Sequence, residues 1–333
     1  MTLPATAGET APAPSVAERA GDGGLASAAA APRTLGGTAR SLLVSLRPRQ
    51  WPKNAVVLVG LVFAREAGDP PQAARAVAAA FLFCLLSGAV YLANDLRDAP
   101  QDRLHPTKRR RPIASGTLSP TVAGVAAAAL VVGGLAASFW LSPAFGAVAL
   151  AYLLLQGAYV GGLKDVVILD VLLLAGGFVL RAVAGAVAVE VPVSPWLYVC
   201  TLLLALFLAL GKRRQELVLL TAAGGAEGPE AHRPALAEYT VPLLDQLLQI
   251  VTTSLLVAYM LYTFFAENLP RSRAMMLTIP FVLYGLFRYL YLVHARGEGG
   301  APEEVLLRDR PLAVTLILWA LASAAILYFV PRG

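Results

Sequence analysis

The sequence predicts an all-α polytopic membrane protein, a bundle of about nine transmembrane helices. Of its 333 residues, 57% are hydrophobic and only 14% are charged, whereas an average soluble domain has about 25% charged residues. The mean hydropathy is +0.66. Long apolar runs alternate with short polar loops, and this arrangement is typical of a polytopic membrane protein rather than of a soluble protein with a large core.

Residues 1–40 are expected to form a disordered tail, followed by a single transmembrane domain over residues 41–333. The tail consists mainly of Ala, Gly, Pro, Ser and Thr and shows no hydrophobic periodicity. Such a composition cannot bury enough apolar surface to order itself. Its most apolar stretch, LASAAAAP, is too short for the core of a signal peptide. We therefore expect the first spanning helix to direct membrane insertion.

A spanning helix needs about 20 mostly apolar residues, and nine segments approach this requirement. The first is the weakest, because its apolar part NAVVLVGLVFA is short unless the preceding RQWPK lies at the membrane interface. Trp51, Trp196 and Trp319 fall near predicted helix ends, where interfacial aromatic residues are common. The predicted spans are 50–66, 72–95, 120–139, 143–161, 166–189, 195–212, 246–266, 273–294 and 311–330.

The distribution of basic residues predicts the orientation of the bundle. The tail and the loops after the second, fourth, sixth and eighth spans hold most of the Lys and Arg residues. By the positive-inside rule, the N-terminus and the long loops lie in the cytoplasm, and the protein lies in the inner, cytoplasmic membrane. The opposite loops are too short to hold a domain, so the functional site is expected on the cytoplasmic side. The six surplus positive charges lie between apolar runs and therefore indicate orientation rather than binding to nucleic acid.

An acidic motif, NDLRDAPQD, follows the second apolar run. Asp95, Asp98 and Asp102 lie on one face if that helix continues past the membrane surface. Stacked like charges at a helix C-terminus destabilise the helix, so the cluster indicates a function. Carboxylate oxygens, with the amide oxygen of Asn94, suit Mg²⁺ held together with substrate phosphates, and the following HPTKRRRP offers cations for a diphosphate. A solvated acidic helix end remains the alternative.

A second polar cluster opens the fifth predicted span. Lys164 precedes this span, and Asp170, Gly177 and Arg181 share one face of the helix. Ionised residues inside a span are costly and usually face a wet cavity or a partner. A structural ion pair is the alternative reading, above all for Arg181.

Two further groups of polar residues stand at predicted cytoplasmic helix ends. Lys53 and Asn54 flank the first span, and Lys212, Arg213 and Glu216 share one face at the end of the sixth. The positive-inside bias alone accounts for the basic residues equally well.

These stretches resemble a known family. NDLRDAPQD fits the NDxxDxxxD motif of the UbiA superfamily of intramembrane prenyltransferases, and the ordered set of motifs resembles its decaprenyl-phosphate phosphoribosyltransferase branch. The resemblance covers residues 41 to 330. Asp165 and Asp170 are five apart, which departs from the second DxxxD motif of the aromatic-prenyl branches, and only Asp170 matches the phosphoribosyl branch. The motifs are LRPRQWPKN at 46–54, HPTKRRRPIASG at 105–116, LKDVVILDVLLLAGGFVLRAVAGA at 163–186, ALGKRRQEL at 209–217 and PEEVLLRDRPL at 302–312.

The resemblance implies a Mg²⁺-dependent enzyme that transfers 5-phosphoribose from phosphoribosyl pyrophosphate to a polyprenyl phosphate of the decaprenyl type. The product, polyprenyl-phosphoryl-5-phosphoribose, would supply cell-wall arabinan and hence arabinogalactan. The implied catalytic and metal-binding residues are Asp95, Asp98, Asp102 and Asp170. The implied substrate-binding residues are Asn94, Lys53, Asn54, Lys108, Arg111, Lys164, Arg181, Lys212 and Arg213.

Two other functions stay open at this point. A UbiA-type prenyltransferase that moves an isoprenoid onto an aromatic quinone or haem precursor shares the fold and the first motif. A cation-coupled transporter usually places its acids near the bilayer midplane at a repeat interface, whereas these acids gather at one membrane surface. The sequence leaves open the isoprenoid length, a homo-oligomeric state and the individual metal ligands. It also leaves open a lid formed by residues 221–239.

Overall fold

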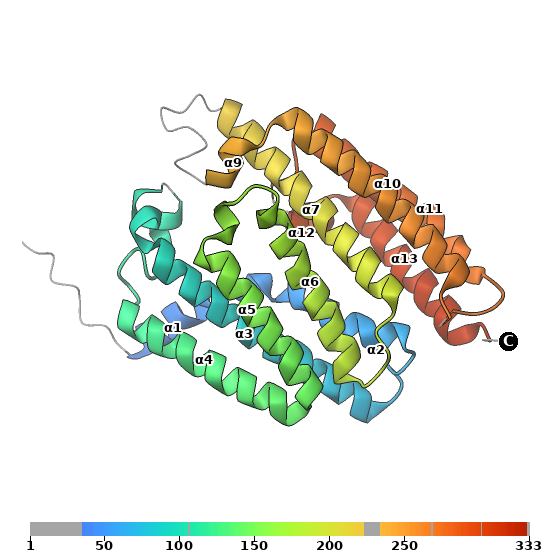
Figure 1. The fold of residues 1–333 in the computed structure, drawn as a ribbon, viewed down its shortest axis with the longest axis horizontal. Helices are drawn as coiled ribbons and strands as arrows, with labels where there is room; N and C mark the ends of the chain where they lie inside the picture. The colour runs from blue at the N-terminus through green and yellow to red at the C-terminus, as the bar shows by residue number, and fades with distance from the viewer. Residues whose placement is uncertain (1–34, 106, 223–233, 268, 301, 332–333) are drawn as a thin grey trace, which may run out of the picture.

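The computed structural model describes residues 35–105, 107–222, 234–267, 269–300 and 302–331. Within these residues all regular structure is helical, as the sequence predicts (Figure 1). The elements are α1 (Leu35–Ser45), η2 (Pro48–Leu58), α2 (Val59–Phe63), α3 (Pro70–Leu104), η3 (Lys108–Arg110), α4 (Pro120–Leu141), α5 (Pro143–Gly161), η4 (Leu163–Asp165), α6 (Leu169–Ala188), α7 (Pro195–Ala222), α9 (Pro234–Glu238), α10 (Val241–Phe265), η5 (Ala274–Thr278), α11 (Ile279–Ala295), α12 (Pro302–Arg308) and α13 (Arg310–Phe329).

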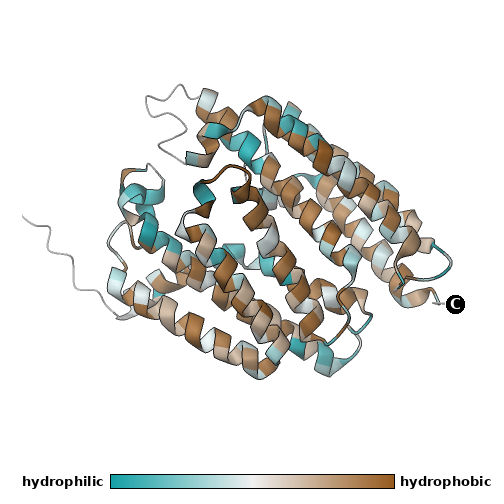
Figure 2. Ribbon diagram, viewed as in Figure 1, coloured by the Kyte–Doolittle hydropathy of each residue, from teal (hydrophilic) through white to brown (hydrophobic). Residues whose placement is uncertain are grey.

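Eight helices in the described part of the chain are long and apolar enough to cross a membrane. They are α3, α4, α5, α6, α7, α10, the continuous η5–α11 segment and α13. Each corresponds to one of the predicted spans, with most ends shifted by a few residues, but α3 runs on to Leu104 and α7 to Ala222, well past the predicted ends at 95 and 212. Figure 2 shows apolar residues along the length of these helices. Many lie on the outer surface, and Trp140 is 90% exposed. Such exposed apolar surface suits contact with lipid rather than water.

The first predicted span, 50–66, is not one continuous α-helix. It consists of the 3₁₀ segment η2 and the short helix α2. Pro52 lies inside η2, where a proline removes a backbone donor from an α-helix. The segment lies against α6, since a Cβ on Gly185 would come within 1.8 Å of the Val57 carbonyl oxygen. This backbone contact holds η2 against α6. Together, η2 and α2 are too short and irregular to form a regular spanning helix.

The start of the folded part lies earlier than predicted. Residues 35–40, which the sequence assigned to the tail, form the first turns of α1, while residues 1–34 lie outside the described residues. Leu42 of α1 and Leu46, the residue that follows the helix, pack against the buried cluster around Leu92 and Ile113. This apolar contact stabilises α1, and the composition of the segment alone did not reveal it.

Two groups of helices make up the bundle. α3, α4, α5 and α6 pack with η2 around Phe83 and Tyr152, and α7, α10, α11 and α13 pack around Phe207 and other large side chains. α6 contacts α7 and thereby joins the two groups, and Figure 1 shows α2 near the end of α13. Arg65, after α2, donates to the Val330 carbonyl oxygen after α13. The first segment and the last helix therefore meet.

α3 reaches well beyond its apolar part. It has 35 residues, while about 20 suffice to cross a bilayer. The helix continues through the acidic motif, which is the condition under which its three acids share one face. Figure 2 shows hydrophilic residues at the end of α3, in η4 and at the adjoining end of α7. We call this the charged end of the bundle and define it by Asp98, Lys164, Asp170 and Arg213.

Candidate active site

The acids of α3 lie on one helix face and contact basic side chains. Asp95 and Asp102 are buried. Arg111 Nη1 lies 3.1 Å from Asp95 Oδ1 and 2.7 Å from Asp102 Oδ2. Arg47 also donates to Asp95 Oδ1. These two guanidinium groups offset the repulsion between stacked carboxylates and satisfy oxygens that burial removes from water.

Asp98, the third acid of α3, faces the loop between α5 and α6. Lys164 Nζ lies 2.9 Å and 3.1 Å from the two Asp98 carboxylate oxygens and 3.4 Å from Asn94 Oδ1. Asn94 Nδ2 donates to Asp98 Oδ2 at 2.9 Å. Lys164 reaches this place because Gly162 ends α5 with a φ of +138°, a conformation that costs glycine little. Three oxygens thus converge on one cationic nitrogen.

Asp170 opens α6 and is fully buried. Arg213 Nε of α7 donates to its Oδ2 at 2.6 Å, and the Tyr239 hydroxyl donates to its Oδ1 at 2.8 Å. Arg213 Nη1 also donates to Glu216 Oε2 at 2.6 Å. Burial and the neighbouring Asp170 carboxylate raise the pKa of the Tyr239 phenol above its usual value, so the hydroxyl carries its proton and donates. The Asp170–Arg213 pair therefore links α6 to α7.

The basic partner of the α3 acids and the acid of α6 lie close together in the sequence. Lys164 binds the α3 cluster, and Asp170 follows six residues later with its partner on α7. The ion-paired acids and their basic partners, from α3 and α6 of the first group of helices and α7 of the second, therefore lie at the charged end. This arrangement can bind a polyanion if basic groups exchange carboxylates for phosphates.

A divalent metal fits the chemistry of the α3 cluster. In the part of the chain that the structure describes, no group of three or more His, Cys, Asp or Glu side chains stands ready to hold a metal. However, Asp98 and Asn94 already direct three oxygens at the Lys164 ammonium, and Asp95 and Asp102 direct oxygens at Arg111. Mg²⁺ commonly takes only one or two carboxylates and completes its shell with water and substrate phosphates. Asp95, Asp98 and Asn94 offer such a set.

Comparison with known proteins identifies the family. The UbiA prenyltransferase family matches residues 54–213. The decaprenyl-phosphate phosphoribosyltransferase of Mycolicibacterium smegmatis is 35% identical over 301 residues, with 86% of this chain and 92% of that protein covered. The protein of the same name from Corynebacterium glutamicum is 34% identical over 300 residues, with 88% of each chain covered. This chain belongs to the UbiA prenyltransferase family.

Solved structures agree with this UbiA assignment at the level of the fold. A UbiA homolog from Archaeoglobus fulgidus bound to GPP and Mg²⁺ matches with a TM-score of 0.65 at 18% identity, covering 86% of this chain and 99% of that one. A structure described for digeranylgeranylglyceryl phosphate synthase matches with a TM-score of 0.60 at 16% identity, covering 88% and 99%. With eight long apolar helices in the part of the chain that the structure describes, this UbiA protein is a multi-pass membrane enzyme.

Arg181 and Asn54 form a second, buried polar network in this UbiA bundle. Arg181 Nε donates to Asn54 Oδ1 at 2.7 Å, Nη2 donates to the Tyr152 hydroxyl at 2.9 Å, and Nη1 donates to the Gly177 carbonyl oxygen at 3.0 Å. Asn54 Nδ2 donates in turn to Ser87 Oγ at 3.1 Å. These contacts tie η2, α3, α5 and α6 together and support a structural role for both predicted substrate-binding residues.

Arg181→Lys should lower the stability of the protein while keeping the charge. A lysine ammonium cannot reproduce the planar guanidinium fork, so the buried Asn54 Oδ1 loses its donor, at a cost of about 1–3 kcal/mol, and the Tyr152 hydroxyl keeps only the hydrogen bond from Gln156 Nε2. We expect a lower unfolding temperature in detergent. Arg308→Lys, at a side chain that is 78% exposed, is the control and should leave it unchanged. Equal unfolding temperatures for the two variants would contradict this role.

Three predicted basic residues lie on elements near the charged end. Lys53 lies in η2 and Lys108 opens η3. Lys212 precedes Arg213 in α7, with its Nζ 4.0 Å from Glu216 Oε1. Lys108 follows the acidic motif in the chain and Lys212 adjoins Arg213, and all three lysines stay candidate phosphate ligands.

Sequence reasoning missed two side chains of the site, Arg47 and Tyr239. Arg47 lies within the motif LRPRQWPKN but was counted only as an orienting charge. Its φ of +52° and its position over the Tyr91 ring aim it at Asp95. Tyr239 ends the segment 221–239, which was read as a loop. Residues 223–233 of that segment lie outside the described residues, so the prediction of a lid there is not tested.

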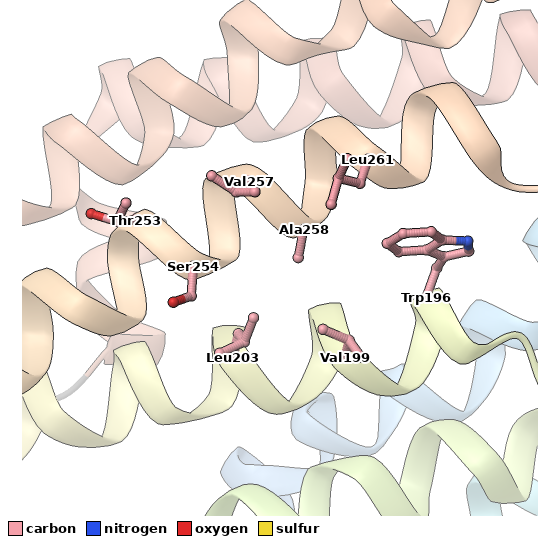
Figure 3. Close-up of a pocket in the computed structure, with 8 residues that line it drawn as sticks. All are labelled: Trp196, Val199, Leu203, Thr253, Ser254, Val257, Ala258 and Leu261. Carbon is pink, nitrogen blue, oxygen red and sulfur yellow. The ribbon is translucent and has the colours of Figure 1, made fainter.

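Two apolar cavities in the described residues are not this site. The larger, about 420 Å³, lies between α7 and α10, whose side chains face one another across it in Figure 3. The other, about 240 Å³, lies between η2–α2 and α13 and is lined by Leu58, Val62 and Trp319, among others. Neither is lined by a charged residue. The polar chemistry belongs to the charged end instead.

Proposed function

We propose that this protein transfers 5-phosphoribose from phosphoribosyl pyrophosphate to a polyprenyl phosphate of the decaprenyl type, with Mg²⁺ as cofactor. The observation that carries the proposal is the similarity, over most of both chains, to relatives named for decaprenyl-phosphate phosphoribosyl transfer. The charged end supports it, because it combines oxygen ligands for a metal with basic groups for phosphates. In a cell-wall pathway, the product would supply arabinan.

Donor binding proceeds by exchange of partners at the charged end. Arg111 and Lys164 release carboxylate oxygens of Asp95, Asp98 and Asp102 and turn to donor phosphates. Arg47 is positioned to do the same. The freed oxygens, with that of Asn94, would hold the metal. When bound, Mg²⁺ neutralises charge on the diphosphate and stabilises it as a leaving group. Each acid is thus paired with a cation both before and after the donor binds, which avoids an unpaired buried charge.

The transfer itself needs no strong general base in this site. The bond between the ribose anomeric carbon and the diphosphate oxygen breaks, and its electron pair leaves with the diphosphate. A bond then forms from the lipid phosphate oxygen to that carbon, through an oxocarbenium-like state. A phosphate monoester is already anionic near neutral pH. Basic groups such as Arg213 and Lys164 act on charge that develops on phosphate oxygens.

The apolar part of the acceptor needs a route from the lipid phase. The cavity between η2–α2 and α13 is lined by Val59, Phe63, Trp319 and Ala320, among others. This lining supports a place for the isoprenoid chain between the first and last membrane segments. We place the charged end, and with it the donor site, on the cytoplasmic side of the inner membrane, because the basic loops lie there.

A transfer assay with the purified protein tests this function. Detergent-solubilised protein is given Mg²⁺ and either labelled phosphoribosyl pyrophosphate with polyprenyl phosphates of several lengths, or labelled prenyl diphosphate with an aromatic acceptor. We expect label in a polyprenyl-phosphoryl product only from the first donor, and loss of that product when EDTA removes the metal. Transfer of the prenyl group instead would assign the rival reaction. Turnover in micelles, where no gradient exists, would exclude a transporter.

A further inference from the structure

A strained turn separates the two basic–acidic pairs of the charged end. Leu169 N donates to the Val167 carbonyl oxygen at 2.8 Å, and Ile168 between them has φ +70° and ψ −44°. This is a γ-turn with a positive φ at its centre, a rare and strained form. A β-branched residue at positive φ is a genuine outlier. The chain adopts the turn despite that strain.

Tyr239 contacts this turn from a distant part of the sequence. Its hydroxyl accepts a hydrogen bond from Ile168 N at 2.8 Å and donates one to Asp170 Oδ1 at 2.8 Å. Tyr239 follows α9, is 3% exposed, and belongs to the same buried cluster as Val171 and Leu244. One hydroxyl group therefore holds both the centre of the turn and the carboxylate that follows it.

The turn determines the position of the two ion pairs relative to each other. Lys164 precedes it and binds Asp98 on α3, while Asp170 follows it and binds Arg213 on α7. Backbone strain persists only where the surroundings fix it, and it concentrates at functional sites. The hydrogen bond from Ile168 and the buried tyrosine ring provide that constraint.

We propose that Tyr239 is a positioning residue, which holds the γ-turn at Ile168 and the Asp170 carboxylate so that both ion pairs face one donor molecule. The kinetic part of this inference rests on the function proposed above. The structural part concerns the turn alone and can be tested without any substrate.

Tyr239→Phe removes the hydroxyl and keeps the ring. In hydrogen–deuterium exchange of the detergent-solubilised protein, peptides covering residues 163–170 should exchange at least about ten-fold faster than in the wild type, because the Ile168 amide loses its partner. The control is Tyr198→Phe on an exposed tyrosine of α7, which should leave these peptides unchanged. Gel filtration shows whether both variants remain folded. If residues 163–170 of the Tyr239→Phe variant exchanged at the wild-type rate, the proposal would be overturned.

Kinetics separate positioning from a general loss of stability. Tyr239→Phe should lower kcat/KM for phosphoribosyl pyrophosphate about ten-fold, the effect of one hydrogen bond to a charged group. The KM for polyprenyl phosphate should stay within about two-fold, because Tyr239 lines neither apolar cavity. Equal losses of kcat/KM for the donor and for the polyprenyl phosphate would contradict a positioning role. If the wild-type protein transfers no phosphoribose, the proposed function fails, while the exchange experiment still decides whether Tyr239 holds the turn.

Ile168→Gly provides a second test of the strain. Glycine adopts positive φ without steric cost, so the turn should depend less on Tyr239. We expect Tyr239→Phe to cause a smaller loss of kcat/KM in the Ile168→Gly background than in the wild type. An equal or larger loss would show that strain at Ile168 plays no part.

Discussion

Asp98→Asn is expected to lower the rate of phosphoribosyl transfer about a hundred- to a thousand-fold, the cost of removing one electrostatic contact to a transition state. Asparagine keeps the size of the side chain but removes the negative charge. In the structure that charge faces the Lys164 ammonium through both carboxylate oxygens. In the proposed donor complex it faces the metal that neutralises the leaving diphosphate. In this proposal the substitution removes a metal ligand, and we expect the fold to persist because the side chain keeps its size.

Single-turnover assays with labelled phosphoribosyl pyrophosphate at saturating Mg²⁺ measure this effect. Asp69→Asn is the matched control, because Asp69 precedes the same helix α3 at its other end and makes no capping hydrogen bond through its side chain. Its rate should stay within about two-fold of the wild type, since surface substitutions usually have small effects. Transfer by Asp98→Asn at the wild-type rate would remove Asp98 from the donor site.

Gly185→Ala should prevent formation of the folded bundle. A Cβ at this position would lie 1.8 Å from the Val57 carbonyl oxygen and 2.7 Å from the Val57 carbonyl carbon, both backbone atoms. Nearby, a Cβ on Gly60 would lie 2.7 Å from Ala186 N. A flexible side chain could move aside, but here all of η2 would have to shift. We expect a cost above the about 1–3 kcal/mol typical of overpacking.

Fluorescence-detected gel filtration and thermal unfolding in detergent measure this loss. Gly133→Ala in α4 is the control, because nothing lies within 4 Å of its added Cβ. Alanine is the better helix former by about 0.5–1 kcal/mol, so this variant should unfold at the wild-type temperature or slightly above. A monodisperse Gly185→Ala protein with wild-type stability would contradict the close packing of η2 on α6.

The sequence predicted those parts of the fold that depend on local pattern. Long apolar runs located eight spanning helices, and the spacing of Asp95, Asp98 and Asp102 predicted that they share a helix face. Hydropathy could not reveal that the first segment is broken, because its shape follows from contact between Gly185 and the Val57 backbone. That contact joins residues far apart in the chain.

The site was harder to predict where a residue acts through another. Arg181 and Asn54 were interpreted from spacing and family motif as substrate ligands, yet their hydrogen bonds join four elements around Tyr152. Tyr239 had no periodic pattern or motif to single it out. Its importance comes from one hydroxyl between Ile168 and Asp170, and only tertiary structure brings these together.

We propose above all that the acids of α3 and the acid of α6 serve one metal-bound diphosphate. A structure of the protein with phosphoribosyl pyrophosphate and Mn²⁺, with the metal located by anomalous scattering, tests it most directly. We predict metal density on the diphosphate beside Asp95 and Asp98, with Lys164 moved from Asp98 to a phosphate and the ribose on the Asp170 side. Metal and donor bound away from α3, or a donor that leaves the Lys164–Asp98 pair intact, would contradict the account.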